Sequence, residues 1–442
     1  MSASDSLALR SGSNAIQGET MLQTQYVQSL GNNLVLKHAT VEDAPRLNAF
    51  NAMIFDPYVG VQTEAIMLHH PTIRPENFIY IEDESTGQIV SSLCLLPWRW
   101  RFDEIELKMG EMGIVGTLPE YRNRGLIRTL VNHLKEMLAE GEYDLSQIGG
   151  IPYYYRQFGY EYALPLEGYW HLPLYHIPSA AENAPAYTFR DATTDDIPTL
   201  MEMYEGASRD LNISAVREPE VWRYQIEHKA ETDSGAYALL MVDPSGKVAG
   251  YVRLKKFGVG SGLIVCEASH FAFSDVPALF RRLKEIAVER GKDPYIRFAL
   301  PPSAVLTQAA KAWGAQFDGY YAWQIHIPHI ARLLRTMIPL FERRIAASPF
   351  AGLTQSVRIN LYRQAYEMIF ENGTITAVNS IGFQDWVGMI CMPPDAFTQL
   401  VMGYRTAEEL REIFPDMMAW GESRNLLAVL FPKTNAYIHM IY

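Results

Sequence analysis

Two distant stretches of the chain share one nine-residue pattern, and this repetition constrains the fold more than any other feature. The pattern, Ala-Thr-x-Glu/Asp-Asp-x-Pro-x-Leu, begins at Ala39 and again at Ala192. Its Thr-x-x-Asp spacing predicts the start of a helix. In both stretches two apolar runs then flank an acidic turn with a glycine, at 78–100 and 237–257, which predicts a β-hairpin. We therefore expect an internal duplication in which each copy opens with a helix and a hairpin.

The two copies differ after the hairpin. The first continues into 116–130, GTLPEYRNRGLIRTL, where arginine and glycine precede a helical pattern. The second continues into 270–291, which has Asp275 and Pro277 at the expected helix start and no glycine-rich turn. We predict that the second copy has lost an anion site and keeps a scaffold role.

A third section begins near residue 327. Its segments 329–348 and 393–414 have apolar residues at helical spacing, and 357–378 predicts a hairpin whose turn is an Asn-Gly pair. The chain ends in 425–442, which predicts an apolar strand followed by an aromatic tail, and an apolar end of this kind is usually docked on the rest of the protein.

These features divide a chain of 442 residues, which is too long for one core, into four parts of a mixed α/β (α+β) protein. Residues 1–33 are rich in Ser, Gln, Asn and Gly and predict a flexible N-terminal extension. The expected domains are 34–175, 185–326 and 327–442.

The charge of the chain limits its partners and its location. A formal net charge of −12 and a pI of about 5.5 argue against a nucleic-acid partner, because such proteins need basic faces. The N-terminus has no charged segment before an apolar run, and nowhere do eighteen apolar residues run together. We therefore expect a cytoplasmic protein without a membrane partner.

No metal site or disulfide framework is predicted. The three cysteines are far apart and lie in apolar contexts, and the paired histidines are not near a cysteine or carboxylate at metal-ligand spacing. The residues concerned are Cys94, Cys266, Cys391, His69, His70, His326 and His329.

The segment 116–130 carries the chemistry. An apolar strand ends near Thr117, and Arg122 to Gly125 stand at the entry of a helix that begins near Leu126. The start of a helix exposes unpaired N–H groups and the positive end of its dipole, so a pyrophosphate fits there. Glycine allows close approach of the backbone, and the arginines add charge. The spacings of a P-loop and of a Rossmann fingerprint are absent.

This segment resembles motif A of the GCN5-related N-acetyltransferases (GNAT), whose pattern R/Q-x-x-G-x-G/A begins here at Arg122 and reaches Gly125. Ile127 stands where many members have Gly or Ala, and the branch that resembles the Eis (enhanced intracellular survival) acetyltransferases often has a larger aliphatic residue there. Further on, 149–163, GGIPYYYRQFGYEYA, is similar to the Tyr-x-x-Phe-Gly-Tyr segment of that branch.

The resemblance implies a catalytic acetyltransferase domain at 34–175, a degenerate second one at 185–326 and a domain like sterol carrier protein 2 (SCP2) at 327–442. It also implies acetyl-CoA as acyl donor. The strand before the loop can bond the pantetheine amides and the thioester oxygen through its backbone. The residues expected to bind acetyl-CoA are Val115, Gly116, Thr117, Arg122, Asn123, Arg124, Gly125, Leu126, Ile127, Arg128, Gly150 and Ile151.

Two tyrosines are the expected catalytic residues. By resemblance, Tyr155 aligns with the family tyrosine that protonates the CoA thiolate; Tyr153 is a rival on spacing alone, since alternate residues of an extended segment share a face. In the Eis-like group the C-terminal carboxylate acts as base, which here belongs to Tyr442. Ile441, which precedes it, is not acidic, so added negative charge must come from elsewhere, with Asp56 as one source.

The resemblance implies a primary amine as acceptor, aminoglycoside-like or lysine-like, and a homo-oligomer, trimer or hexamer. A rival hypothesis keeps the C-terminal domain as a lipid carrier beside a vestigial acetyltransferase domain.

Overall fold

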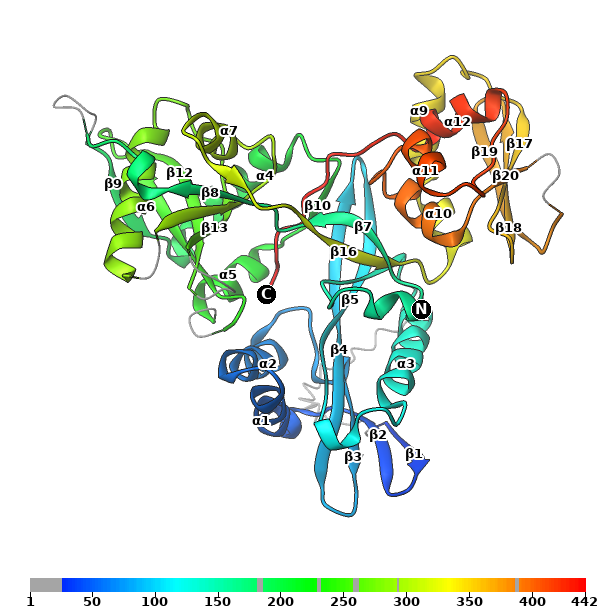
Figure 1. The fold of residues 1–442 in the computed structure, drawn as a ribbon, viewed down its shortest axis with the longest axis horizontal. Coiled ribbons are helices and arrows are strands. Elements are labelled where there is room, and N and C mark those ends of the chain that lie inside the picture. The colour runs from blue at the N-terminus through cyan, green and yellow to red at the C-terminus, as the bar shows by residue number, and fades with distance from the viewer. Residues whose placement is uncertain (1–25, 181–185, 229–231, 257–261, 292–293, 386–388) are drawn as a thin grey trace, which may run out of the picture.

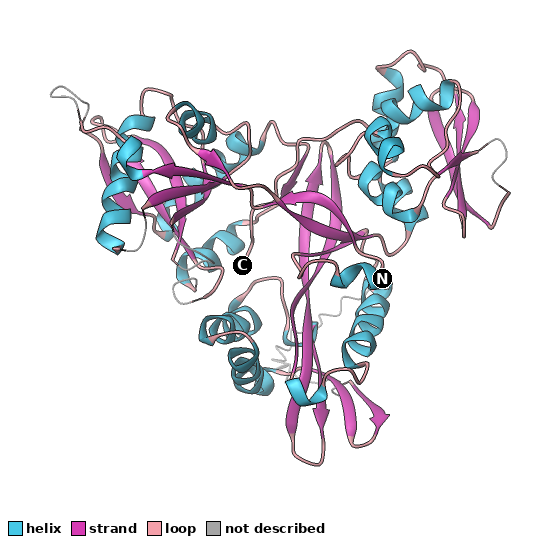
Figure 2. Ribbon diagram, viewed as in Figure 1, coloured by secondary structure: helices cyan, strands magenta, loops and turns pink. Residues whose placement is uncertain are grey.

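The computed structural model describes residues 26–180, 186–228, 232–256, 262–291, 294–385 and 389–442. They form three lobes joined at the centre of the molecule (Figure 1), and each lobe combines a sheet with helices (Figure 2). The fold is mixed α/β, as predicted. Of the predicted N-terminal extension, residues 1–25 lie outside the described residues, whereas β1 (Val27–Gly31) pairs with the strand that follows it.

The first unit is built on a nine-stranded sheet with the order β1-β2-β3-β4-β5-β6-β16-β7, and β10 pairs with β4 beside this path. Helices α1 and α2 lie on one side of the sheet and α3 on the other (Figure 1). The bounds are β2 (Leu34–His38), β3 (Phe78–Asp83), β4 (Gln88–Phe102), β5 (Ile105–Thr117), β6 (Leu145–Ile148), β7 (Glu161–Leu166), β10 (Ile213–Ala215), β16 (Tyr321–His326), α1 (Ala44–Ile54), α2 (Pro57–His69) and α3 (Leu126–Glu140).

The second unit is built on a seven-stranded sheet with the order β15-β8-β14-β13-β12-β11-β9. As in the first unit, two helices precede the central hairpin and one long helix joins two parallel strands. The bounds are β8 (Tyr169–Pro173), β9 (Thr188–Asp191), β11 (Ala236–Val242), β12 (Val248–Lys255), β13 (Leu263–Ala268), β14 (Tyr295–Ala299), β15 (Gln316–Phe317), α4 (Ile197–Ser208), α5 (Pro219–Glu227), α6 (Val276–Arg290) and α7 (Val305–Ala312).

The two units exchange a strand. β8 belongs by sequence to the first copy but pairs with β14 in the second sheet, and β16 belongs by sequence to the second copy but lies between β6 and β7 in the first sheet. The sheets therefore do not follow the expected boundaries at 175 and 326, although the domain division itself stays a prediction.

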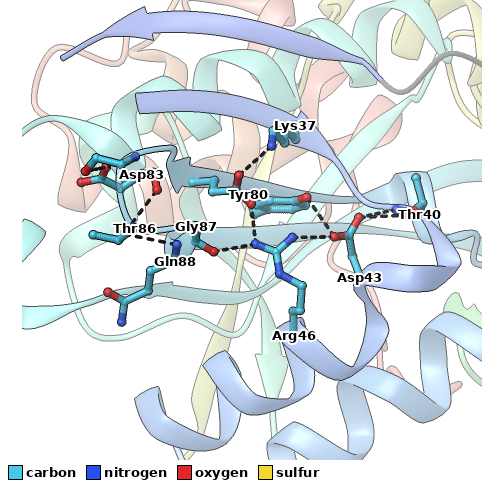
Figure 3. Close-up of polar contacts among 11 residues, drawn as sticks. Lys37, Thr40, Asp43, Arg46, Tyr80, Asp83, Thr86, Gly87 and Gln88 are labelled. Atoms are coloured by element: carbon cyan, nitrogen blue, oxygen red, sulfur yellow. Dashed lines mark hydrogen bonds and ion pairs between the residues drawn. The ribbon is translucent and has the colours of Figure 1, made fainter. Parts of the chain in front are cut away.

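The capping geometry of the two copies is the same. The Asp43 carboxylate accepts hydrogen bonds from the backbone N–H and the hydroxyl of Thr40 at 2.9 and 3.1 Å (Figure 3). In the second copy, Asp196 accepts from Thr193 at 2.8 and 3.1 Å. Each such cap stabilises a helix start by about 1 kcal/mol. The repeated helix starts, predicted from the Thr-x-x-Asp spacing, are confirmed in atomic detail.

The hairpin turns repeat as well. Asp83 accepts from the N–H and hydroxyl of Ser85 at 3.0 and 2.5 Å, and Asp243 accepts from the N–H and hydroxyl of Ser245 at 2.8 and 2.6 Å. These are Asx turns, which aspartate forms with its own backbone two residues on. Both predicted hairpins, β3–β4 and β11–β12, are therefore confirmed.

Among its described residues, the third unit combines five helices with a four-stranded sheet of the order β19-β18-β17-β20. Its hairpin turns at Asn372 and Gly373, whose φ angles of 49° and 83° fit the predicted Asn-Gly turn. The bounds are β17 (Gln355–Asn360), β18 (Ala365–Glu371), β19 (Thr374–Gly382), β20 (Ile390–Cys391), α8 (Ile330–Thr336), α9 (Ile338–Ala346), α10 (Pro394–Val401), α11 (Ala407–Ile413) and α12 (Glu422–Leu430).

The expected apolar strand near the end of the chain is wrong, because residues 422–430 form helix α12. Leu426, Leu427 and Leu430 are its buried positions, and their spacing puts them on one face of a helix. A short apolar run does not distinguish a strand from a buried helix.

The expected docking of the aromatic tail is confirmed. The tail, residues 435–442, leaves the third unit and runs between the other two (Figure 1). Asn435 N–H donates to the Asn212 side chain at 2.8 Å, and Asn212 N–H donates to the Asn435 carbonyl at 2.7 Å. Tyr437 N–H donates to the Ile213 carbonyl at 3.1 Å. The tail is thus bonded to β10 and the residue before it, a segment of the second copy that pairs with β4 of the first sheet.

Candidate active site

The central strands of the first unit separate at one point. β5 and β6 pair in parallel only through Met109, Gly110 and Glu111, whereas β5 continues to Thr117. A bulge follows at Ile114, where φ is 49° and the register with β4 shifts. Bulges bend a strand and locally disrupt its pairing. Beyond the bulge β5 pairs again with β4, whereas its other side, where the pairing with β6 ended at Glu111, faces a gap.

The loop that follows β5 leads directly into α3. Asn123 and Gly125 have φ angles of 62° and 79°, so the chain turns twice through the left-handed region before the helix begins. The first helical bond runs from Thr129 N–H to the Gly125 carbonyl at 3.0 Å. The amides of the preceding helical residues, Leu126 to Arg128, hence point out of the helix end. Such a turn and helix end concentrate N–H groups for an anion.

Arginines surround this helix end, and each is held by its neighbours. The Arg124 guanidinium donates to the Glu120 carbonyl at 2.9 Å and lies 4.7 Å from the centre of the Tyr121 ring. Arg128 donates to the Gln157 side chain at 3.0 Å. The Tyr121 hydroxyl in turn donates to Asp83 at 2.8 Å, which ties the loop to the β3–β4 turn.

A cavity of about 730 Å³ joins the separated strands to the helix end. Its walls come from β5, the loop, α3, the end of α1 and the segment after β6. Of the residues expected to bind acetyl-CoA, ten line it: Val115, Gly116, Thr117, Arg122, Asn123, Gly125, Leu126, Ile127, Arg128 and Ile151. The expected residues Arg124, Gly150 and Tyr442 do not line it.

Tyr155 lies inside the cavity wall, and the structure distinguishes it from its rival. Tyr155 is 5% exposed and lines the cavity, whereas Tyr153 is 74% exposed and does not. Burial raises the pKa of the Tyr155 phenol well above its usual range. Gly150 explains the fit, because a Cβ there would stand 2.1 Å from the Tyr155 ring. The absence of a side chain at Gly150 therefore leaves room for the Tyr155 ring.

Tyr442 contacts an earlier part of β5, where its hydroxyl meets Glu111, a carboxylate that was not predicted from the sequence. Its hydroxyl donates to Glu111 Oε1 at 2.7 Å, and Gln147 Nε2 donates to Oε2 at 3.0 Å. Glu111 is 4% exposed. Burial raises its pKa to about 7, even though these two hydrogen bonds act in the opposite direction. Glu111 is also the last residue of β5 that pairs with β6, so it stands at the start of the gap.

The sequence does contain a signal for Glu111, because it is a charged residue within the apolar run 109–115 and buried carboxylates are rare unless they have a function. Asp56, the source of negative charge that we considered, instead caps α2 by accepting from the N–H groups of Tyr58 and Val59 at 2.8 and 3.1 Å.

Two further findings concern the described residues as a whole. Within these ranges, no group of three or more His, Cys, Asp or Glu side chains is arranged to hold a metal ion. The helices of the same ranges include none that is long and apolar enough to cross a membrane.

Residues 36–163 match the acetyltransferase (GNAT) domain family. This segment contains the separated strands, the loop, α3, Tyr155 and Glu111. The predicted activity, that of an acetyl-CoA-dependent N-acetyltransferase, is therefore confirmed at the level of this domain. No curated protein sequence matches the chain.

Solved structures share the fold over nearly the whole chain. A probable N-acyltransferase from Enterococcus faecalis is 15% identical, with 92% of this chain and 100% of that chain covered and a TM-score of 0.69. A GCN5-related N-acetyltransferase from Anabaena variabilis is 17% identical, with 92% and 99% covered and a TM-score of 0.65. Eis1 from Mycobacterium abscessus is 14% identical, with 95% and 100% covered and a TM-score of 0.56. At these identities the likeness concerns the fold alone.

Proposed function

We propose that the acetyltransferase domain moves an acetyl group from acetyl-CoA to a primary amine of a cationic acceptor, aminoglycoside-like or lysine-like. The observation that carries the proposal is the single cavity that joins the helix end, the strand gap and Tyr155. One continuous surface would thus contact the phosphates, the thioester and the leaving thiolate of the donor.

The donor would lie along the residues already described. Its diphosphate would accept hydrogen bonds from the amides of Leu126 to Arg128, and the arginines at the rim would add charge. Its pantetheine arm would pair with the backbone of Val115 to Thr117. Gly116 packs closely against α1, since a Cβ there would stand 2.9 Å from Ile54 Cγ2, so the wall behind the arm is tight.

The transfer needs three proton movements. The ammonium first loses one proton, the neutral amine attacks the thioester carbonyl carbon, the new C–N bond forms, and the C–S bond breaks to release the thiolate. Tyr155 gives its proton to that thiolate, because a buried phenol stays protonated at neutral pH, and the phenolate takes back the second proton of the amine nitrogen, which leaves a neutral amide and the CoA thiol. The ammonium proton is taken up by Glu111 through the Tyr442 hydroxyl, which accepts one proton as it passes its own to the carboxylate. A pKa of about 7 suits a base that works near neutrality.

The rest of the chain completes the proposal. The second unit would be a degenerate acetyltransferase domain, the third an SCP2-like domain, and the whole an Eis-like protein; the shared fold over 95% of the chain with Eis1 supports this arrangement. By the same resemblance we expect a homo-oligomer, trimer or hexamer; the cytoplasmic location stays an expectation from the sequence. The rival function, a lipid carrier, has less support, because the third unit uses large apolar side chains such as Phe341, Leu400 and Leu427 as buried core.

Calorimetry with acetyl-CoA, followed by CoA release with a panel of amines, tests this function. Tyr155→Phe should leave acetyl-CoA affinity unchanged and lower kcat by about 100-fold, as loss of a general acid does. Tyr143→Phe removes a comparably buried phenol away from the cavity and should keep full activity. Absence of acetyl-CoA binding by the unmodified protein, or retention of a lipid in native mass spectrometry without CoA, would reject the proposal.

A further inference from the structure

The strands of the second unit separate as those of the first unit do. β13 and β14 pair in parallel only from Leu263 to Val265, and the register with β12 shifts after Val265. In the first unit the corresponding gap opens into the cavity. In the second unit the gap is closed by the tail, because Tyr437 donates its hydroxyl to the Ala299 carbonyl at the end of β14 at 2.5 Å. Only about 30 Å³ remains there.

A buried series of hydrogen bonds connects the second unit to the end of the tail. Gln225 Nε2 donates to the Met440 carbonyl at 2.9 Å, and its Oε1 accepts from Arg217 Nη1 at 3.2 Å. Arg217 Nη2 donates to Glu267 Oε2 at 2.7 Å. The side chains of Gln225, Arg217 and Glu267 are all buried.

The chemistry of these groups fixes the orientation of the glutamine. A guanidinium has only donors, so the Gln225 amide must turn its oxygen to Arg217 and its NH₂ to the tail. Arg217 cannot move away, since it pairs with Glu267 and lies 3.9 and 4.1 Å from the ring centres of Tyr204 and Trp222. Burial alone would raise the pKa of Glu267, but the neighbouring arginines hold it at about 2, so the pair is charged at every working pH.

Such a buried ion pair rarely adds stability, because desolvation offsets the attraction. The effect of the ion pair here is to orient Gln225, whose side-chain NH₂ group then donates to the Met440 carbonyl of the tail. Met440 precedes Tyr442 by two residues, about 7 Å of extended chain. On the other side, His70 Nε2 lies 3.4 Å from the Ile441 carbonyl. The last residues of the chain are thus held from both units.

We propose that Gln225, oriented by Arg217 and Glu267, is a positioning residue that fixes the register of the C-terminal tail and thereby places the Tyr442 hydroxyl on Glu111. The second unit, which lacks the loop of the first, would contribute to the reaction by holding the tail. This inference rests on the proposed roles of Tyr442 and Glu111.

Gln225→Leu removes the donor to the tail at similar volume, and it should lower kcat by about tenfold without changing the acetyl-CoA Kd. The acid limb of the kcat profile should move to higher pH, because the hydrogen bond from Tyr442 lowers the Glu111 pKa and would be lost. Gln62→Leu is the matched control: it removes another buried glutamine between the units, one that bonds Ser234 and not the tail, and should keep kcat and the pH profile.

A double-mutant cycle with Tyr442→Phe separates this proposal from the proposed function. If Gln225 acts through Tyr442, the double variant should be no slower than Tyr442→Phe alone. If Tyr442→Phe keeps full kcat, the proposed proton route fails; if Tyr442→Phe is slow while Gln225→Leu is normal, or if the two effects multiply, the positioning role fails. Should Gln225→Leu not fold, Gln225→Glu keeps the partner of Arg217, still lacks the donor to Met440, and should show the same loss; full kcat in this variant would equally overturn the role.

Discussion

Replacing Glu111 by glutamine should make the enzyme much slower and, above neutral pH, more stable. The carboxyl group has its pKa raised from 4.5 to about 7, chiefly by burial. At 1.36 kcal/mol for each pKa unit, ionising it in the folded protein costs about 3 kcal/mol more than in the unfolded chain. Because the folded pKa is the higher one, this stability is present below pH 4.5 and is lost as the pH rises to about 7.

Glu111→Gln never ionises, so its free energy of unfolding should exceed that of the unmodified protein by up to about 3 kcal/mol at pH 8 and by little near pH 4. The new amide fits the site, since Tyr442 can still donate to its oxygen. Gln147 can turn to accept from its NH₂, because Gln147 Oε1 has no hydrogen-bond partner among the described residues. Loss of a base should lower kcat by at least 100-fold and remove the acid limb near pH 7.

Urea unfolding at a series of pH values tests the predicted gain in stability, and kcat measured at the same pH values tests the predicted loss of the base. A stability difference that does not change with pH would refute the raised pKa. An unchanged acid limb in the variant would refute Glu111 as the base.

Three further substitutions probe the cavity. Tyr121→Phe loses the bond to Asp83 that anchors the loop, and isothermal calorimetry should show acetyl-CoA binding weakened about threefold with kcat at saturation unchanged. Gly150→Ala drives a methyl group into the Tyr155 ring, so thermal melting should show a loss of stability of about 1–3 kcal/mol, and kcat should fall as well. The control is Gly206→Ala, whose added methyl group meets nothing within 4 Å and should lower neither stability nor kcat. Gly125→Ala and Gly291→Ala both strain a left-handed position with open space around it, by about 1–2 kcal/mol each, yet acetyl-CoA affinity should fall only for Gly125→Ala.

The sequence predicted the local elements of the fold well because short-range chemistry specifies them. Helix starts followed from Thr-x-x-Asp, and the hairpins followed from Asp-containing turns; both recur in the structure with nearly equal distances. The loop before α3 was readable for the same reason, since Gly125 has the left-handed φ that its position requires. These signals lie within a few residues of one another.

What the sequence did not reveal depends on contacts between distant residues. Nothing local to Glu111 says that Tyr442, the last residue of the chain, will reach it. Nothing local to β8 or β16 says that each pairs in the other copy's sheet. The different burial of Tyr153 and Tyr155 likewise depends on the packing of Gly150 and the cavity wall.

The exchange of β8 and β16 sets the order in which the molecule can be completed. While the chain leaves the ribosome, β6 and β7 have no strand between them until residue 326 has been synthesised. Until then both strands present unpaired edges, which attract other chains. The first copy alone therefore lacks one strand of its sheet. We expect a gene cut near residue 175 to yield aggregated product, and a stable shorter piece to need both copies.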